Sequence, residues 1–226
     1  ASSLSVPSPV LKGEVTKGYN EDGTPGGDYL GGVKWIAGST SSGFAITEDN
    51  RCVMWGIPKW SGELPIGVTN ENVLKEPIYI RDKNGDPIEN VTHISGGDEN
   101  VYMRTSDGEL WALGPWNGNR NNNITINENY ATKVQKDDGT PLTNIKMSAA
   151  GDQCGFAVTG DGFVWGWGDA WGGCSGQKGV SLKARKVNAG DYSKISGESF
   201  LTDVTQVIGG RGHGAAVTKE GYLLYW

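Results

Sequence analysis

The sequence has few of the residues that most enzymes use for catalysis or metal binding. Its 226 residues include two histidines, His93 and His213, and three cysteines, Cys52, Cys154 and Cys174. Three cysteines cannot form a fully paired set of disulfides, and none belongs to a C-x-x-C pair, so a structural zinc site is not expected. The sequence also lacks a G-x-S-x-G elbow, an H-E-x-x-H pair and a G-K-[ST] phosphate loop. We therefore expect a protein that is not an enzyme and that uses no metal or cofactor.

Long apolar runs and clustered basic residues are missing as well. No stretch approaches the roughly 18 apolar residues of a membrane-spanning helix, and the first ten residues lack the charged-then-apolar pattern of a targeting peptide. The 20 Lys and Arg are outnumbered by 26 Asp and Glu, which gives a net charge of −6. Because binding to phosphate backbones needs clustered basic side chains, nucleic acid is not an expected partner. The lack of a long apolar run means that membrane insertion is not expected either.

Glycine and tryptophan, by contrast, are plentiful. The chain has 36 Gly, and nine Trp against four Phe; an ordinary glycine share is about 7%, so this excess indicates many tight turns. Four segments align with one another without gaps: 38–56, 96–114, 150–168 and 209–226. Their shared threonines, Thr47, Thr105, Thr159 and Thr218, are 58, 54 and 59 residues apart. This period favours a repeat that forms one four-stranded sheet with one longer loop.

Each repeat predicts the same hairpin. Two residues after the threonine comes an acid, followed by Asn or Gly: Asp49-Asn50, Asp107-Gly108, Asp161-Gly162 and Glu220-Gly221. An Asx-Gly pair between apolar runs is a strong hairpin signal. Eight residues past the threonine stands a large apolar residue: Trp55, Leu113, Trp167 or Trp226. Such a residue in one strand register packs neighbouring sheets together, whereas no window sustains a helical i, i+3, i+4, i+7 pattern.

The remaining strands complete an all-β architecture. First strands are expected at 33–37, 91–95, 145–149 and 204–208, and fourth strands at 77–80, 132–135 and 184–187. The repeats therefore span 33–80, 91–135, 145–187 and 204–226, and the last one lacks its fourth strand. Residues 7–11 have a suitable composition and are followed by the link 22–25, which matches 138–141. We expect a single-domain small β-propeller of four four-stranded sheets, whose ring is closed when residues 7–11 pair with the C-terminal sheet.

The fourth repeat has the fullest set of motif residues: Gly209-Gly210, His213, Ala215–Thr218, Glu220-Gly221 and Tyr225-Trp226, with Trp55-Gly56 and Gly62-Glu63-Leu64 in the first repeat. This pattern resembles the repeat of the regulator of chromosome condensation family of β-propellers. The chain departs from the family in three ways. Its histidine column reads Ser42, Asn100, Cys154 and His213, its loops are longer and richer in Asn, and it has four repeats where the family commonly has seven sheets. Either the ring is a tight one of four sheets, helped by small residues on the inner strands, or the chain belongs to a larger assembly. The resemblance implies a propeller and permits a scaffold or an exchange factor for a small GTPase.

The predicted strand order places two sets of loops on one rim. One set follows the first strands (39–42, 97–100, 151–154 and 210–213), and the other follows the third strands (57–76, 115–131 and 169–183). The tight hairpin turns fall on the opposite rim. Because loops on a rigid scaffold are where recognition usually resides, we predict that the rim with the longer loops binds the partner.

Two groups of residues on this rim are candidates for contact with a partner. Trp60, Trp116 and Trp171 suit sugar stacking or a protein contact, or else cap their own sheets. Asp98, Asp152, Arg211 and His213 are expected near the central channel, as a small-ligand or cation site or as solvated loop side chains. Asn119, Arg120 and Tyr130 complete the predicted partner-binding set.

Three functions follow from these features. The first is recognition of a cell-surface protein or glycan by an adhesion module outside the cell or on a virion, most specifically a phage tail tip. It is motivated by the acidic charge and by turns such as 83–87 and 136–141, which look like those of viral tail proteins. The second is a cytoplasmic scaffold or GTPase exchange factor. The third is a secreted enzyme inhibitor that plugs an active site with a Trp-lined rim.

Overall fold

The computed structural model describes residues 8–56, 74–98, 100–114, 130–168, 176, 179–190 and 199–226. Within them, strands form four antiparallel sheets. The first sheet contains β1 (Trp35–Gly38), β2 (Ser42–Ile46), β3 (Cys52–Gly56) and β4 (Leu74–Tyr79). The second contains β5 (Val91–Gly96), β6 (Val101–Thr105), β7 (Leu110–Leu113) and β8 (Thr132–Lys133). The third contains β9 (Ile145–Ala150), β10 (Cys154–Thr159), β11 (Val164–Gly168) and β12 (Ser181–Lys186), and the fourth β13 (Val204–Gly209), β14 (Gly214–Thr218) and β15 (Leu223–Tyr225).

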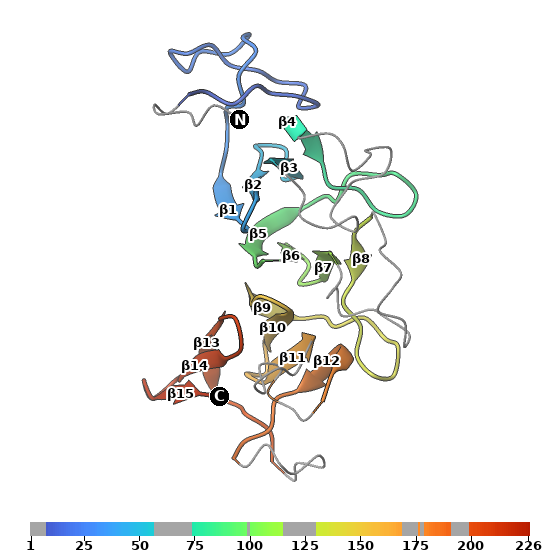
Figure 1. Cartoon of the computed structure of the whole chain (residues 1–226), viewed down its shortest axis with the longest axis vertical. Coiled ribbons are helices and arrows are strands. Elements are labelled where there is room, and N and C mark those ends of the chain that lie inside the picture. The colour runs from blue at the N-terminus through green and yellow to red at the C-terminus, as the bar shows by residue number, and fades with distance from the viewer. Residues whose placement is uncertain are drawn as a thin grey trace.

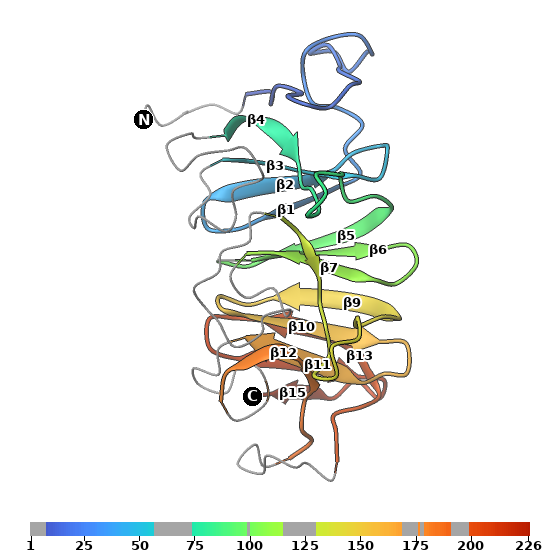
Figure 2. The ribbon, with the colours of Figure 1, turned by 90° about the vertical axis from the view of Figure 1, so that its right-hand side faces the viewer.

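The sheets follow one another along an arc, as Figure 1 shows, and Figure 2 shows them stacked face against face. Each sheet has its strands in chain order, so one repeat makes one sheet. The predicted fold class, an all-β propeller built from four repeats, is confirmed. So is the turn chemistry: the residue after each turn acid has a positive φ, namely 59° at Asn50, 81° at Gly108 and 85° at both Gly162 and Gly221.

The core lies between successive sheets. The tryptophan column packs toward the preceding sheet, so that Trp167 meets Tyr102 and Trp226 meets Phe156, each edge to face with centroids 5.2 and 5.6 Å apart. In three of the four repeats this tryptophan pairs with a glycine on the neighbouring strand, at Gly43–Trp55, Gly155–Trp167 and Gly214–Trp226. A Cβ atom on these glycines would lie 2.6, 2.5 and 2.4 Å from the indole. Where the column is Leu113, its partner is Val101, so the two positions vary together to fill one volume.

Backbone hydrogen bonds also join each sheet to the next. The first residue of an inner strand donates its N–H to the turn of the preceding sheet: Val91 to Asn50 (2.8 Å), Ile145 to Gly108 (2.9 Å) and Val204 to Gly162 (3.2 Å). The residue before each of these donors, Asn90, Asn144 or Asp203, has a φ of 57 to 60°. The left-handed conformation therefore sets the angle at which each new sheet begins.

The predicted closure of the ring is wrong. Leu11 bridges Tyr29, and Leu30 donates its N–H to the carbonyl of Val10 (2.7 Å), so residues 8–11 pair with their own neighbours. The last sheet therefore has three strands. In both views residues 8–32 lie at one end of the arc and the last sheet lies at the other.

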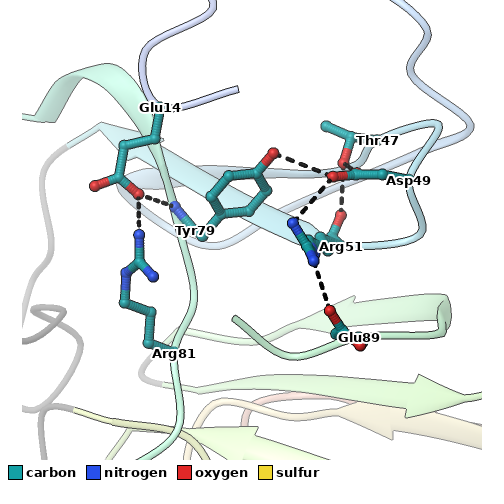
Figure 3. Close-up of polar contacts among 7 residues, drawn as sticks. All are labelled: Glu14, Thr47, Asp49, Arg51, Tyr79, Arg81 and Glu89. Carbon is teal, nitrogen blue, oxygen red and sulfur yellow. Dashed lines mark hydrogen bonds and ion pairs between the residues drawn. The ribbon is translucent and has the colours of Figure 1, made fainter. Parts of the chain in front are cut away.

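Residues 8–32 instead cover the outer strands of the first sheet. Val15 and Leu30 pack with Ala45, Val53 and Trp55. Figure 3 shows the accompanying polar contacts: the Glu14 carboxylate accepts from the Tyr79 N–H (3.0 Å) and from the Arg81 guanidinium (2.8 Å). The segment thus takes the place of the outer part of a preceding sheet. Among the described residues there is no helix that could cross a membrane.

Candidate functional site at the rim of the central channel

Four short turns, one from each sheet, line one rim of the arc. Each follows an inner strand and closes with a backbone hydrogen bond from its first residue to its fourth: Ser39 to Ser42, Gly97 to Asn100, Gly151 to Cys154 and Gly210 to His213, at 2.8 to 2.9 Å. The second residue of each turn is therefore held in the same place by every repeat. That column contains Thr40, Asp98, Asp152 and Arg211.

The glycines let these turns approach one another closely. A Cβ atom on Gly97 would lie 2.0 Å from the carbonyl oxygen of Gly151, and one on Gly151 would lie 2.7 Å from that of Gly210. Because backbone atoms cannot move aside as a side chain can, only glycine fits at these positions without a shift of the turns. The Asp152 N–H donates directly to the Gly210 carbonyl (3.2 Å) across the junction.

Side chains of the column also contact each other across the junctions. The Thr40 hydroxyl donates to the Asp98 carboxylate, which joins the first and second sheets. Arg211 Nε lies 3.4 Å from Asp152 Oδ2, which joins the third and fourth. The Arg211 side chain is 91% exposed and that of Asp152 20% exposed, so this ion pair is a surface pair that contributes roughly 0–1 kcal/mol to stability.

The turns surround a surface depression of about 540 Å³. It is lined by side chains of the column and by the small residues beside them: Thr40, Gly96, Gly97, Asp98, Ala150, Gly151, Asp152, Gly209, Gly210 and Arg211. Two carboxylates and one guanidinium stand over a floor of glycine-rich backbone. Such a surface offers hydrogen bonds and charge, but little apolar area to enclose a small ligand.

Of the four residues in the predicted group, Asp98, Asp152 and Arg211 line the depression. His213 is not among the lining residues; its ring stacks on Tyr225, with centroids 5.3 Å apart. Tyr130 is half-buried beside Ala131, whose N–H donates to the Arg81 carbonyl, and it is not among the lining residues either. Trp60, Trp116, Asn119, Arg120 and Trp171 lie outside the described residues.

Thr40 and the glycine floor are features that the sequence reasoning missed. The signal was available, because Thr40 stands seven residues before its threonine, as do Asp98, Asp152 and Arg211. Within the described residues, no group of three or more His, Cys, Asp or Glu side chains could hold a metal ion.

A second column, on the inner strands, contains Trp35 and His93. The Trp35 indole lies against the His93 ring, with centroids 4.7 Å apart, and its Nε1 donates to the Ile94 carbonyl (3.3 Å). Burial lowers the pKa of His93, and the nearby Arg104 cation lowers it further. A backbone hydrogen bond at Ser148 acts in the opposite direction, but the net shift is downward, so the neutral imidazole is favoured here.

No family model matches the chain, but its fold recurs in solved structures. The chain superposes on human WBSCR16 with a TM-score of 0.67 and 16% identity, over 89% of this chain and 49% of that one. It superposes on yeast RCC1 (Prp20), crystallised with Kap60, with a TM-score of 0.62 and 19% identity, over 86% of this chain and 43% of the other. A structure of Prp20p from Saccharomyces cerevisiae, reported with its binding to Gsp1p and histones, gives 0.56 and 20%, over 83% and 43%.

These structures confirm the predicted resemblance at the level of the fold, which is that of RCC1-like β-propellers. The chain spans about half the length of each of the three. None of the three is a phage tail protein, so the tail-tip interpretation stays a prediction without support from them.

Proposed function

We propose that this chain is a non-enzymatic module that binds a protein partner at the rim depression. The observation that carries the proposal is the convergence of four equivalent turns, one from each sheet, on a single surface. A rigid scaffold that presents a ring of short turns is a common arrangement for recognition. The turns are tied to each other through backbone contacts, so the surface is organised before a partner arrives.

The chemistry of the depression favours a polar, basic segment of a protein over an apolar small molecule. Asp98 and Asp152 supply carboxylates, and the whole chain is acidic, with a net charge of −6. Opposite charge steers association and fixes the register of a complex. The propellers of similar fold that are described with partners were studied with proteins, namely Gsp1p, histones and Kap60, which supports a protein partner over a glycan.

The test is a direct binding measurement with matched variants. The chain is immobilised and titrated with histones, with a panel of small GTPases and with cell-envelope glycans; nucleotide release is recorded for the GTPases. We expect a protein to bind, and the double variant D98N/D152N to weaken that binding at least tenfold. Asp138→Asn is the control, because Asp138 is an exposed carboxylate in a link on the opposite rim.

The outcomes of the binding experiment distinguish between the candidate partners. Accelerated nucleotide release would narrow the proposal to an exchange factor. Binding to glycans alone, or equal binding by wild type and D98N/D152N, would contradict it.

A further inference from the structure

The last sheet exposes a face that every other sheet buries. Leu223 and Tyr225, on β15, and Ile208, on β13, point away from the third sheet and form what we call the trailing face. Leu223 is 73% exposed, whereas Leu110, in the same column of the second sheet, is 0% exposed because it packs against the third sheet. The trailing face therefore has the composition of a sheet–sheet junction, and none of the described strands packs on it.

The first sheet exposes the complementary side. Val33 and Ile36, which we call the leading edge, face away from the second sheet. Ile36 is 72% exposed, whereas its equivalent Ile94 is 2% exposed against the first sheet. A hollow of about 430 Å³ lies beside the leading edge, lined by Val33, Lys34, Trp35 and Ile36.

The leading edge is the part of the first sheet that a preceding sheet would contact. In the internal junctions the inner strand of each sheet packs on the first two strands of the sheet before it: β5 on β1 and β2, β9 on β5 and β6, and β13 on β9 and β10. Residues 8–32 cover the outer strands of the first sheet. They leave the inner strand β1 open, which is the strand that forms such a junction.

The backbone is also prepared for this junction. Gly32 has a φ of 62°, like Asn90, Asn144 and Asp203 before the other inner strands. The next residue, Val33, is the counterpart of the N–H donors Val91, Ile145 and Val204. The counterpart of their acceptors in the last sheet is the carbonyl of Gly221. In the described part of a single chain, no hydrogen bond joins Val33 N–H to a preceding turn.

We propose that two copies of this chain join head to tail into one ring of eight sheets. The trailing face of each copy packs on the leading edge of the other, and Val33 N–H of one copy donates to the Gly221 carbonyl of its partner. The first and last sheets lie at opposite ends of the arc (Figure 1), and Ile36 and Ile208 are both exposed, so the leading edge and the trailing face of one chain do not meet. A second copy supplies both missing surfaces at once, and a two-fold axis makes the two junctions identical. The similar propellers, twice as long, match one copy over about half their length.

The test is the mass of the full 226-residue chain in solution by light scattering after gel filtration. We expect twice the chain mass of 24.1 kDa. Ile36→Asp and Ile208→Lys should each give the single-chain mass. An equimolar mixture of the two should regain the doubled mass, because one junction is then wild type and the other pairs Asp with Lys. Val180→Asp is the control, since Val180 is an exposed apolar residue on neither end, and it should keep the doubled mass.

Other outcomes would overturn the proposal. The first is a wild-type chain with the mass of one copy, and the second is a mixture of the two variants that keeps the mass of one copy. The third is an Ile36→Asp variant that keeps the mass of two copies, which would indicate that trailing faces pair with each other. Because Ile36 and Ile208 are exposed, we expect both variants to fold, and circular dichroism verifies that they do. Hydrogen exchange of the wild type gives a second readout: amides 33–37 and 221–225 should lose protection on dilution to the single-chain form.

Discussion

The junction between the second and third sheets and the face of the fourth sheet are made from the same columns of the repeat, yet one is dry and the other is open to water. At the junction, Trp167 is fully buried and its Nε1 donates to the hydroxyl of Tyr102 (3.1 Å). In the same junction Ala112 is fully buried, whereas Tyr225, which holds the equivalent position on the trailing face, is 73% exposed and contacts His213. Burial in this fold is therefore decided by whether a neighbouring sheet is present, and the residue type alone does not reveal it.

The two leucines of one column provide the sharpest test of this difference. Leu110→Ala removes a fully buried side chain from the second junction and should lower the free energy of unfolding by about 2–5 kcal/mol. Leu223→Ala, at the equivalent exposed position, should change it by less than about 0.5 kcal/mol. Both are measured by urea unfolding in the Ile36→Asp background, so that assembly does not contribute. Equal losses would mean that the fourth sheet is covered within a single chain.

Two glycines of another column give a second, smaller contrast. A Cβ atom on Gly96 would lie 2.3 Å from the carbonyl oxygen of Gly38, whereas one on Gly38 has no atom nearer than 3.8 Å. Gly96→Ala should therefore destabilise the chain by about 1–3 kcal/mol through displacement of the preceding turn. Gly38→Ala should be nearly neutral, because an added Cβ atom at this position meets only open space and an ordinary contact at 3.8 Å. Thermal unfolding of the two variants is measured in the same background. Equal losses of stability would mean that the close contact of Gly96 with the preceding turn is not the cause.

His93 lies at the junction between the first and second sheets, where its ring contacts Trp35, and it should make the stability of the chain depend on pH. Its pKa is lowered in the folded chain, chiefly by burial, so the unfolded chain binds a proton more readily. Stability should be complete above the ordinary histidine pKa of about 6.5 and should fall as the pH drops through the lower folded value. His93→Gln should flatten this part of the stability profile in chemical denaturation. A wild-type profile that is already flat between pH 7 and 5 would mean that the imidazole is solvated.

Much of the fold could be predicted because the repeat states it four times. The hairpin turns depend on residues such as Asn50 and Gly108, whose positive φ is a local property, and the apolar columns mark which positions meet another sheet. The predicted first strands of all four repeats and the predicted fourth strands of the first three repeats overlap the observed strands for the same reason.

The closure of the ring could not be predicted, because the composition of residues 7–11 fits any sheet edge. What decides their partner is the hydrogen-bonded turn Asn20–Thr24, which folds the chain back on itself so that Leu11 meets Tyr29. The anchoring of Glu14 on Arg81 and Tyr79 (Figure 3) joins residues 65 or more apart and has no local signal.

The rim site was predictable as a column but not in its details. Asp98, Asp152 and Arg211 share one repeat position, and the structure gathers them at the depression. His213, only two residues after Arg211, ends the turn, and its ring lies between Gly210 and Tyr225 without lining the depression.

The central claim is that one chain forms an open arc whose N-terminal segment belongs to the first sheet. The most direct test is a backbone nuclear Overhauser spectrum of the folded chain, kept as single copies by Ile36→Asp. The account predicts cross-strand contacts between Leu11 and Tyr29 and none from Leu11 to residues 223–225. Contacts between Leu11 and β15 would contradict it and would show a ring closed within one chain.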